Sequence, residues 1–476
     1  MVISNQEIIN RIKQLTGNDA FVYDKKSEKW LSYNEVWMTA VSLARIPAIR
    51  DHSSIIAITE NGIHLFSLYF ACMISNTTII PLDPHKAEKE LDDIIGENPD
   101  TPVLKDDDAL WENNDLLNEP NAESLSELIS QIDLEKVYMI TYTSGSTGHA
   151  KGVIHSLRNL FLAAAAFGEA TGLNGDYTMC HVMPMTYMAG ILNTIIMPFY
   201  RGCKIVLLPR FDVISAVSFW KNVEKYDITA FWLSPTMLNV LMTIDRKAKI
   251  KEYLDNRKTL FFIGTAPLFE NVRNNFEGRY GVKLLQSYGL SETLFISTER
   301  PETENDSKSV GSVLDDVVLT FLKDGEIGIR VPWMFYGYSN ENTDDYFWEN
   351  NYMSGDLGEV KNNRLYITGR KKDLIVKGGM NISPSQIEKC IAQTGLVKEC
   401  AVSGVVIKDE ENIVCWYVRG NGAGNPEKEI NRGIEEKLGR HCRIDYFFEV
   451  DEIPKNLNGK TDKKKLAEDT RNDLKV

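Results

Sequence analysis

The feature that most restricts the fold of this chain is an alternation of short apolar segments with longer amphipathic ones. The short segments have the length of buried strands, and they are Ile55–Ile58, Ile79–Ile80, Val137–Ile140, Ile205–Leu208, Phe231–Leu233 and Leu260–Ile263. Helical periodicity fills the intervals, as in Leu160–Phe167 and Ala216–Lys225, and Ser4 with Glu7 predicts a capping box at the first helix. Because strands that alternate with helices form parallel sheets covered by helices, the sequence predicts an α/β fold.

The pattern changes after about residue 310, where turn signals become more frequent. Asp324-Gly325 and Asn362-Asn363 predict the turns of two hairpins. Further along, helical patterns at 384–393 and 426–439 alternate with strand patterns at 400–407, 412–418 and 445–449. This stretch is long enough for a separate α+β domain of about 100 residues. We therefore expect an N-terminal domain at 1–371 and a C-terminal domain at 372–476.

Composition excludes several classes of protein. The 476 residues contain 53 Lys and Arg against 67 Asp and Glu, and a net charge of −14 disfavours a nucleic-acid partner. The seven cysteines form no CxxC pair, so a disulfide framework or a zinc site is disfavoured and a reducing compartment is favoured. The residues Met1–Glu7 lack the basic start and apolar core typical of a signal peptide, and no apolar stretch of about 18 residues occurs, so neither a signal peptide nor a spanning helix is expected. We expect a cytoplasmic enzyme without a membrane span.

One loop has the composition of a phosphate-binding site. The predicted strand Val137–Tyr142 leads into Thr143–Gly152, which is rich in glycine and hydroxyl residues and contains Lys151. Glycines allow backbone N–H groups to converge on an anion, hydroxyls add donors, and the lysine adds charge. The spacing GxxxxGK is absent, so a P-loop NTPase is disfavoured. A flexible surface turn is the alternative, and the preceding strand together with Lys151 favours a polyphosphate.

The same loop belongs to an ordered set of motifs that runs along most of the chain. The other members are Pro81–Pro84, Gly264–Leu268, Gln286–Thr293, Ser354–Gly358, Gly369–Arg370, Gly378–Pro384 and Asn458–Lys460. Together they resemble the adenylate-forming superfamily of acyl-CoA synthetases, peptide-synthetase adenylation domains and firefly-type luciferases. The resemblance implies a large N-terminal region of helix-covered sheets with a distorted barrel, followed by a small mobile α+β domain.

The resemblance also implies the reaction and its residues. A carboxylate would attack the α-phosphate of ATP and release pyrophosphate, with Glu292 as the ligand of Mg²⁺ and Ser291 as a donor to the α-phosphate. Lys460 would bridge the carboxylate and the α-phosphate, and Lys372 would be the hinge between domains. The nucleotide-binding residues implied are Thr143, Ser144, Gly145, Ser146, Thr147, Gly148, Lys151, Gly264, Thr265, Ala266, Ser287, Tyr288, Asp356 and Arg370.

The family's acyl pocket corresponds to the apolar segment His181–Ile191, where Tyr187 takes the gating position and Met188 follows it. Amino-acid activators place an aspartate here, and this segment has none, which disfavours an α-amino acid. Gly289 stands where acetate-type synthetases have tryptophan, so the resemblance implies room for a longer acyl group. Trp232 either limits the far end of the pocket or belongs to the core. We expect a medium-sized, largely apolar acid.

Two features point to different acceptors for the acyl group. Gly378-Gly379 and the residues around them resemble CoA ligases, whereas Asn458–Leu466 resembles the ending of enzymes that load the phosphopantetheine of a carrier protein. We favour coenzyme A and keep the acyl carrier protein as the alternative. A catalytically silent nucleotide-binding protein on the same scaffold is a third hypothesis, which the joint presence of Lys151, Glu292 and Asp356 disfavours.

Overall fold

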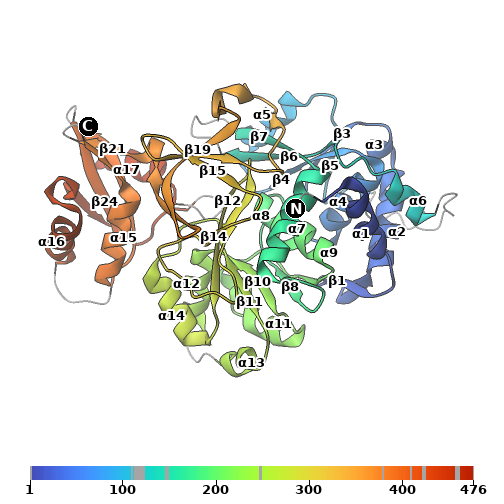
Figure 1. Ribbon diagram of the computed structural model, residues 1–476, viewed down its shortest axis with the longest axis horizontal. Coiled ribbons are helices and arrows are strands. Elements are labelled where there is room, and N and C mark those ends of the chain that lie inside the picture. Colours follow the sequence, from blue (N-terminus) through green and yellow to red (C-terminus); the bar gives the residue numbers. More distant parts are fainter. Residues whose placement is uncertain are drawn as a thin grey trace.

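The structure is a computed structural model of the chain, shown in Figure 1. It describes residues 3–108, 111, 124–144, 150–245, 249–377, 380–407, 410–420, 425–455 and 461–474. Two large sheets and their helices make up the N-terminal part, and a smaller body formed by residues after about 380 lies at one end of the long axis (Figure 1). The predicted α/β fold, with a large N-terminal region and a smaller C-terminal one, is confirmed.

The first sheet has the strand order β17-β7-β6-β4-β3-β5. Its strands are β3 (Ser54–Ile58), β4 (Thr78–Leu82), β5 (Val103–Lys105), β6 (Val137–Ser144), β7 (Ala150–Ser156) and β17 (Gly337–Tyr338). The central strands β5, β3, β4 and β6 pair in parallel, and β7 then turns back against β6. Ser144 lies opposite Ala150 across the turn, so the predicted phosphate loop connects two paired strands at the edge of a parallel sheet.

The second sheet is larger and has the main order β15-β16-β19-β20-β14-β13-β12-β11-β10-β8-β9-β1-β2. Its first half contains β1 (Ala20–Asp24), β2 (Lys29–Ser32), β8 (Thr178–His181), β9 (Lys204–Leu207), β10 (Ala230–Leu233), β11 (Leu260–Ile263) and β12 (Leu284–Leu290). Its second half contains β13 (Leu294–Thr298), β14 (Ser312–Val313), β15 (Val318–Phe321), β16 (Glu326–Arg330), β19 (Asn351–Lys361) and β20 (Arg364–Arg370), and β18 (Phe347–Trp348) pairs with β19. Among the described strands, the first and last of this order, β15 and β2, do not pair with each other. These strands therefore form an open sheet, and the expected distorted barrel is not closed.

Helices cover both sheets. In the N-terminal part they are α1 (Asn5–Gln14), α2 (Tyr33–Ala44), α3 (Pro47–Arg50), α4 (Ile63–Ser75), α5 (Glu88–Glu97), α6 (Leu125–Ser130), α7 (Leu157–Thr171), α8 (Met188–Ile191), the π-helix η3 (Leu192–Ile196), α9 (Met197–Arg201), α10 (Val213–Ala216), α11 (Phe219–Lys225), α12 (Pro235–Ile244), α13 (Lys251–Asp255) and α14 (Glu270–Tyr280). Strand β10 shows why such coverage is needed. Ala230 and Trp232 pack into the core shared with α4 and α7, whereas Phe231 and Leu233 pack into the core beneath α11 and α14. A strand buried on both faces is the expected property of a helix-covered parallel sheet.

Local sequence signals are realised where a residue type fits a specific backbone geometry. Ser4 and Glu7 form the capping box at the start of α1, with both reciprocal bonds present. Asn362 and Asn363 have φ of 50° and 60° in the turn between β19 and β20, which is the conformation that this kind of hairpin turn requires. The helix expected over Ala216–Lys225 is wrong in one respect, because it is broken between α10 and α11. There Val217 and Ser218 make tight-turn bonds to Ile214 and Ser215 in place of helical ones.

The C-terminal part has its own core around the sheet β23-β24-β25. Its elements are β21 (Ile375–Lys377), β22 (Met380–Ile382), α15 (Pro384–Thr394), β23 (Val397–Ile407), β24 (Glu410–Arg419), α16 (Pro426–Leu438), β25 (Tyr446–Glu449) and α17 (Lys463–Leu474). On β24, Cys415 packs towards α15 and α16 and Trp416 packs towards α17, so this sheet too is buried on both faces. The expected boundary at 371/372 falls in the short 3₁₀ helix η5 (Lys371–Asp373), and it stays a prediction.

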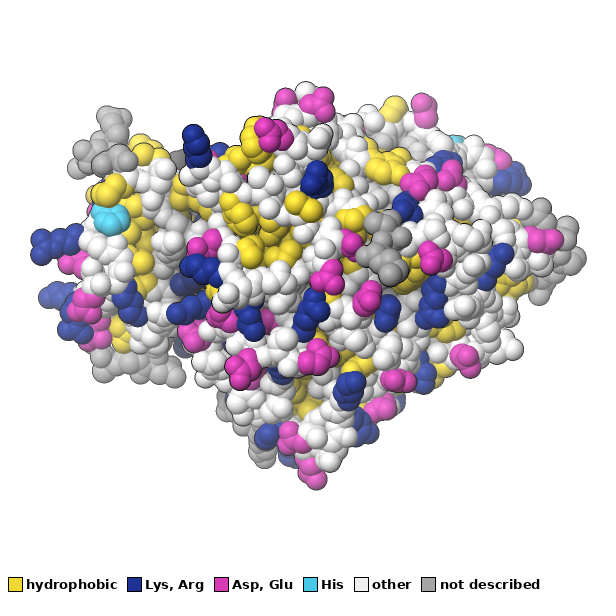
Figure 2. All heavy atoms as spheres, viewed as in Figure 1, with side chains coloured by type: hydrophobic (Ala, Val, Ile, Leu, Met, Phe, Trp, Pro, Cys, Tyr) yellow, Lys and Arg dark blue, Asp and Glu magenta, His cyan; other side chains and the backbone are white. Residues whose placement is uncertain are grey.

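The two parts meet where α15 begins. Ser383 Oγ and Ser385 Oγ donate to the carbonyl of Thr368 at 2.8 and 3.0 Å, and Lys389 Nζ donates to the carbonyl of Ile367 at 3.1 Å. Basic and acidic side chains are interspersed over the face of the molecule in Figure 2. In the part of the chain that the structure describes, no helix combines the length and the apolarity that crossing a bilayer would need.

Candidate active site

The candidate site centres on a buried carboxylate, Asp356, in the middle of β19. Asp356 lies opposite Arg370 in the β19–β20 register, and Arg370 Nε donates to Asp356 Oδ1 at 2.7 Å. From β12, the phenol of Tyr288 donates to Asp356 Oδ2 at 2.6 Å. The Asp356 side chain is 3% exposed, so these two donors stabilise a carboxylate that burial alone would penalise. Burial, with the neighbouring Asp356, raises the pKa of Tyr288 well above its usual value and keeps its hydroxyl a donor.

A cavity of about 270 Å³ adjoins this carboxylate. It is lined by Ser354, Gly355, Arg370, Lys371 and Lys372. Glu326 orders one wall, because its carboxylate accepts from the Gly355 N–H at 3.2 Å and from Lys371 Nζ at 2.7 Å. The cavity is therefore lined by three cationic side chains, of which Arg370 is paired with Asp356 and Lys371 with Asp324 and Glu326. An anionic ligand that also carries hydroxyl groups fits such a lining.

Lys151, the lysine of the predicted phosphate loop, lies in a cage of aromatic and acidic groups. Its Nζ is 2.7 Å from Glu341 Oε2 and donates to the hydroxyl of Tyr346. The same ammonium stands 4.2 Å from the ring centroid of Tyr346 and 5.2 Å from that of Tyr338. Burial acts to lower the pKa of Lys151, but the bonds to Glu341 and Tyr346 outweigh it and raise the pKa, so the lysine remains a cation.

Glu292 joins the same network through one tyrosine. Tyr338 donates its hydroxyl to Glu292 Oε1 at 2.8 Å, and that hydroxyl lies 3.0 Å from the hydroxyl of Tyr352. Burial, followed by the nearby Glu292, raises the pKa of Tyr338 far above the usual tyrosine value. Because Lys151 Nζ lies 5.2 Å from the centroid of the same ring, Tyr338 contacts both the carboxylate of Glu292 and the ammonium of Lys151.

The turn between β12 and β13 connects the two groups of residues. Tyr288 lies before this turn and binds Asp356, whereas Glu292 lies within it and binds Tyr338. Below the turn, His155 of β7 bonds the carbonyl of Ser291 through Nε2 at 2.7 Å. Five residues predicted from the sequence are thus brought together, namely Lys151, Tyr288, Glu292, Asp356 and Arg370. No contact described here shows what the hydroxyl of Ser291 binds.

The structure describes only the two ends of the phosphate loop and does not describe the predicted bridging lysine. Thr143 and Ser144 end β6, and Thr143 Oγ1 lies 3.5 Å from the carbonyl of Lys151. Gly145, Ser146, Thr147 and Gly148 lie outside the described residues, and so does Lys460. The residues on either side of that lysine's segment are paired, since Lys455 and Thr461 form a bridge at the edge of the C-terminal part.

The predicted nucleotide-binding residues Gly264, Thr265 and Ala266 follow β11 directly. Ile263 pairs with Gln286, so Gly264, directly after β11, lies next to Ser287 within β12. Thr265 has φ of 70°, a left-handed conformation that a β-branched residue rarely adopts, and such strain is concentrated at functional sites. Ser287 Oγ lies 2.9 Å from Thr298 Oγ1, and no contact described here joins Ala266 to the other site residues.

The residues predicted for the acyl group lie on a different element. Tyr187 caps the start of α8, Met188 is buried in its first turn, and both Tyr187 and Tyr288 pack against the same core. A Cβ on Gly289 would lie 2.1 Å from the carbonyl oxygen of Leu294, so the turn itself requires glycine here. The presence of Gly289 therefore says nothing on its own about the size of the acyl group. Trp232 is 3% exposed and stacks in the core beside Gly264.

Sequence reasoning missed three side chains that shape the site: Tyr338, Glu341 and Tyr346. They follow β16 in a stretch that has little periodicity, and only the folded chain brings them to Lys151. The one available signal was the concentration of tyrosines and acidic residues over 336–346. Buried His155 was also missed, because a histidine in an apolar strand is usually a core residue.

Glu292 fits the predicted magnesium ion. Among the described residues, no group of three or more histidine, cysteine, aspartate or glutamate side chains could hold a metal ion. Mg²⁺ needs no such cage, because it is commonly held by one or two carboxylates, substrate phosphates and water. Glu292, fixed by Tyr338 beside the strand that begins at Ala150, has the chemistry and the place for such a ligand.

Two family models match most of this chain. The sequence model of the AMP-binding enzyme family matches residues 10–339, and that of the AMP-binding enzyme C-terminal domain matches residues 386–460. A malonate–CoA ligase of Arabidopsis thaliana is 26% identical over 374 residues, which cover 71% of this chain and 62% of that protein, less than two thirds. A 2-succinylbenzoate–CoA ligase of Bacillus cereus is 25% identical over 445 residues, 88% of this chain and 89% of the relative.

Solved structures share the fold over nearly the whole chain. ATP-bound MatB from Rhodopseudomonas palustris superposes with a TM-score of 0.83 at 23% sequence identity, and the match covers 98% of this chain and 99% of that one. At this identity the similarity establishes the fold alone. It extends through the C-terminal part, so both parts of the chain have the architecture of that structure.

Proposed function

The chain belongs to the AMP-binding enzyme family of the adenylate-forming superfamily, and on this premise we propose that it is an AMP-forming acid–CoA ligase. In the first step a carboxylate oxygen bonds to the α-phosphorus of ATP while the bond to pyrophosphate breaks, giving acyl-AMP. In the second step a thiol attacks the acyl carbon, AMP leaves, and the thiol proton is released. The observation that carries the proposal is a pair of networks joined by the turn between β12 and β13. One connects Lys151 through Tyr338 to Glu292, and the other connects Tyr288 to Asp356 and Arg370.

Each end of this network suits one part of ATP. A carboxylate offers about four lone-pair sites, so Asp356 can accept two ribose hydroxyls while keeping its bonds to Tyr288 and Arg370. At the other end, Lys151 and the loop 143–151 would hold the β- and γ-phosphates. Glu292 would hold Mg²⁺, which when bound screens the charge of the phosphates. Ser291 lies between the two ends and would donate to the α-phosphate.

Lys460 and Lys372 have roles in the motion that we propose for the C-terminal domain. As negative charge shifts between the carboxylate and the α-phosphate, a flexible ammonium on the C-terminal domain can follow it, and we assign this role to Lys460. Lys372 lies within η5, where the chain passes from β20 to the C-terminal part. A hinge needs only a few residues whose backbone torsion angles can change, and the three-residue helix η5 is a segment of this length.

We propose a medium-sized, largely apolar acid that is not an α-amino acid. The segment around Tyr187 and Met188 is apolar and contains no carboxylate for a substrate ammonium. Gly264 lies beside Trp232, whose ring packs in a cluster with those of Phe167, Phe262 and Phe295, with centroid distances of 4.1–5.7 Å within the cluster. This aromatic cluster supports an acyl pocket that is closed at its far end. The acids named for the two relatives above, malonate and 2-succinylbenzoate, differ too much to choose one.

Coenzyme A is the acceptor we favour, and the carrier protein remains the alternative because Asn458–Leu466 resembles the carrier-loading form. All seven cysteines are buried and free, which supports function in a reducing compartment such as the cytoplasm. No single structural contact distinguishes the two acceptors, since Gly378, Gly379 and residues 456–460 lie outside the described part of the chain.

The test is ATP–pyrophosphate exchange over a panel of acids, followed by mass spectrometry of the acyl-AMP that forms. We expect exchange that depends on a medium-sized apolar acid and on magnesium, and that Asp356→Asn weakens about tenfold or more through KM for ATP. Thioester formation with free CoA, compared with a phosphopantetheinylated carrier, then identifies the acceptor. ATP binding without exchange for any acid would favour the silent nucleotide-binding protein, and clear preference for acetate or an α-amino acid would overturn the substrate class.

A further inference from the structure

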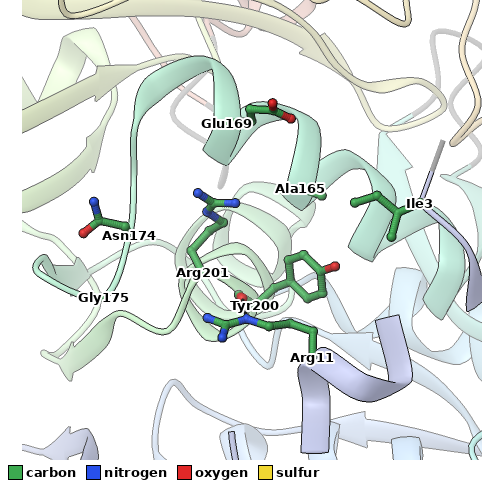
Figure 3. Close-up of a pocket in the computed structure, with 8 residues that line it drawn as sticks. All are labelled: Ile3, Arg11, Ala165, Glu169, Asn174, Gly175, Tyr200 and Arg201. Carbon is green, nitrogen blue, oxygen red and sulfur yellow. Dashed lines mark hydrogen bonds between the residues drawn. The ribbon is translucent and has the colours of Figure 1, made fainter. Parts of the chain in front are cut away.

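A second cavity lies apart from the candidate active site, where α1, α7 and α9 meet. Its volume is about 440 Å³, and Figure 3 shows the residues that line it: Ile3, Arg11, Ala165, Glu169, Asn174, Gly175, Tyr200 and Arg201. None of these residues belongs to the adenylate-forming motifs. The cavity therefore has no part in the reaction proposed above and needs an explanation of its own.

Two arginines are held in fixed orientations at this cavity. Arg11 Nε donates to the carbonyl of Tyr200 at 2.9 Å, and Arg201 Nε donates to the carbonyl of Leu173 at 2.7 Å. These bonds secure each side chain through its inner nitrogen. Figure 3 shows the Arg201 guanidinium above the Tyr200 side chain, on the side of Glu169, and the Arg11 guanidinium below it. Arginine forks fixed in this way lose little entropy when they bind an oxyanion.

The glycines around the arginines keep this arrangement open. A Cβ on Gly202 would lie 2.9 Å from Arg11 Nη2, and a Cβ on Gly168 would lie 2.5 Å from Arg201 Cδ. Any larger residue at either position would displace a guanidinium from the cavity. The placement of both side chains thus depends on glycine at two separate elements.

The charge of the cavity is not neutralised by the protein. Among the described residues, neither Arg11 nor Arg201 forms an ion pair with a carboxylate. Arg11 Nη1 instead donates to the neutral amide oxygen of Gln14 at 3.2 Å, and Glu169 is the acidic residue of the lining. Two cations and one anion leave the cavity with an excess positive charge in a chain of net charge −14. A basic residue in the last turn of a helix commonly bonds the carbonyls of its own helix. Arg11 and Arg201 lie in the last turns of α1 and α9, but they donate to carbonyls of other segments, Tyr200 and Leu173, and both line one cavity.

We infer that this cavity binds a small phosphate monoester. Guanidinium groups bind phosphate with paired, charge-assisted hydrogen bonds, and two of them match the charge of a dianion. The volume exceeds that of a bare anion, and Ile3, Ala165 and the ring of Tyr200 offer apolar surface for a compact organic group. The phosphate lies between Arg11 and Arg201, and the organic group lies against Tyr200.

Calorimetric titration with phenyl phosphate at constant ionic strength tests this inference. We expect saturable binding to the full chain and binding weakened by about tenfold or more in Arg11→Gln and in Arg201→Gln, because each removes one charged fork. Glu169→Gln removes a negative charge that repels the phosphate, so this variant should bind phenyl phosphate more tightly. Arg432→Gln on the exposed face of α16 is the matched control and should leave binding unchanged. Binding that survives in the Arg11→Gln/Arg201→Gln double variant is assigned to the loop 143–151 and subtracted.

Three results would overturn the inference. The first is no saturable binding of phenyl phosphate beyond that of the double variant, and the second is equal binding in wild type and both single arginine variants. The third is saturable binding of succinate with none of phenyl phosphate, which would assign the cavity to dicarboxylates. Thermal unfolding of each variant, together with Arg11→Lys and Arg201→Lys, keeps the test valid if a glutamine variant does not fold.

Discussion

Tyrosine hydroxyls position the charged side chains of the candidate site together with direct ion pairs. Tyr288 binds Asp356, Tyr338 binds Glu292, and Tyr346 binds Lys151. Asp356 also pairs with Arg370, and Lys151 also pairs with Glu341. Each phenol has a rigid ring, so it adds a directed hydrogen bond without adding a charge, and such preorganised polar groups suit the binding of a polyanion.

The bridging role of Lys460 can be separated from every other role by measuring the two half-reactions. Lys460→Ala removes the ammonium that would follow the charge between carboxylate and α-phosphate, so we expect acyl-AMP formation to fall by orders of magnitude. Thioester formation from preformed acyl-AMP should change little. The neighbouring variant Lys465→Ala, on the exposed side of α17, is the control. Equal loss in both half-reactions would remove Lys460 from this role.

Buried His155 predicts an acid-sensitive fold. Burial lowers the pKa of His155 to about 4 from an ordinary value of 6.5, so the unfolded chain binds a proton more readily than the folded one. Stability from this residue is complete above pH 6.5 and is lost as the pH falls towards 4. The loss amounts to about 2 kcal/mol between pH 7 and pH 5. His181 acts in the same direction, since burial lowers its pKa to about 3.

Unfolding by urea at pH 7 and pH 5 measures this effect. His155→Gln keeps a donor for the carbonyl of Ser291 and cannot take up the proton, so the variant should lose less stability on acidification by about 2 kcal/mol. His52→Gln, at an exposed position, should lose as much as the wild type. An unchanged acid loss in His155→Gln would show that other groups govern the pH dependence.

At the level of secondary-structure elements, the segment from β8 to α9 combines close packing with an irregular helix. α8, the π-helix η3 and α9 form one continuous helical stretch, and π-helical turns are common near functional sites. Gly190 makes this geometry possible, because a Cβ there would lie 1.9 Å from the carbonyl oxygen of Pro184. Tyr187 and Met188, the predicted acyl-site residues, lie in the sequence between Pro184 and Gly190.

Two glycine-to-alanine variants should therefore shift stability in opposite directions. Gly190→Ala forces the Pro184 carbonyl away and should cost about 1–3 kcal/mol, as overpacking usually does. Gly278→Ala lies inside α14 with no atom near the new methyl group, and it should gain up to about 1 kcal/mol from helix propensity. Thermal unfolding midpoints measure both. A neutral Gly190→Ala would show that the Met183–Met185 loop adapts without cost.

The sequence predicted elements best where one face or both faces are strictly apolar. Leu260–Ile263 is β11 without change, and the two hairpin turns at Asp324-Gly325 and Asn362-Asn363 fall where their backbone conformations require. Ala216–Lys225 was less accurate because the break at Val217 and Ser218 depends on turn bonds that periodicity does not encode. For the site, motif order predicted Lys151, Glu292, Tyr288, Asp356 and Arg370, which the fold brings near one another and whose roles stay predictions. Tyr338, Glu341 and Tyr346 could not be found, because their partners are distant in sequence.

On the scale of the whole molecule, the C-terminal part is a body with its own core that touches the rest through few polar contacts. The contacts at Thr368 and Ile367 involve backbone carbonyls of β20, directly before η5. Polar contacts of this kind can break and re-form at low cost, since water satisfies the freed groups. This agrees with the proposal that the C-terminal part turns about Lys372 between the two half-reactions.

A reversible crosslink can test whether such a rotation is needed. A Cβ on Gly369 would lie 3.2 Å from Ser383 Cβ, close to the separation of about 3.8 Å found in disulfides. Gly369→Cys with Ser383→Cys should therefore form a disulfide that ties β20 to the start of α15. All seven native cysteines are buried, so oxidation should act on the introduced pair.

If the two half-reactions need different orientations of the C-terminal part, the oxidised double variant retains at most one of them. We expect acyl-AMP formation or thioester formation to fall by about tenfold or more on oxidation, and dithiothreitol to restore it. Each single cysteine variant should be insensitive to oxidation, which controls for damage at other thiols. Full activity of the oxidised protein in both half-reactions, with the disulfide verified by mass spectrometry, would mean that one arrangement of the two parts serves the complete reaction and that Lys372 is not a hinge.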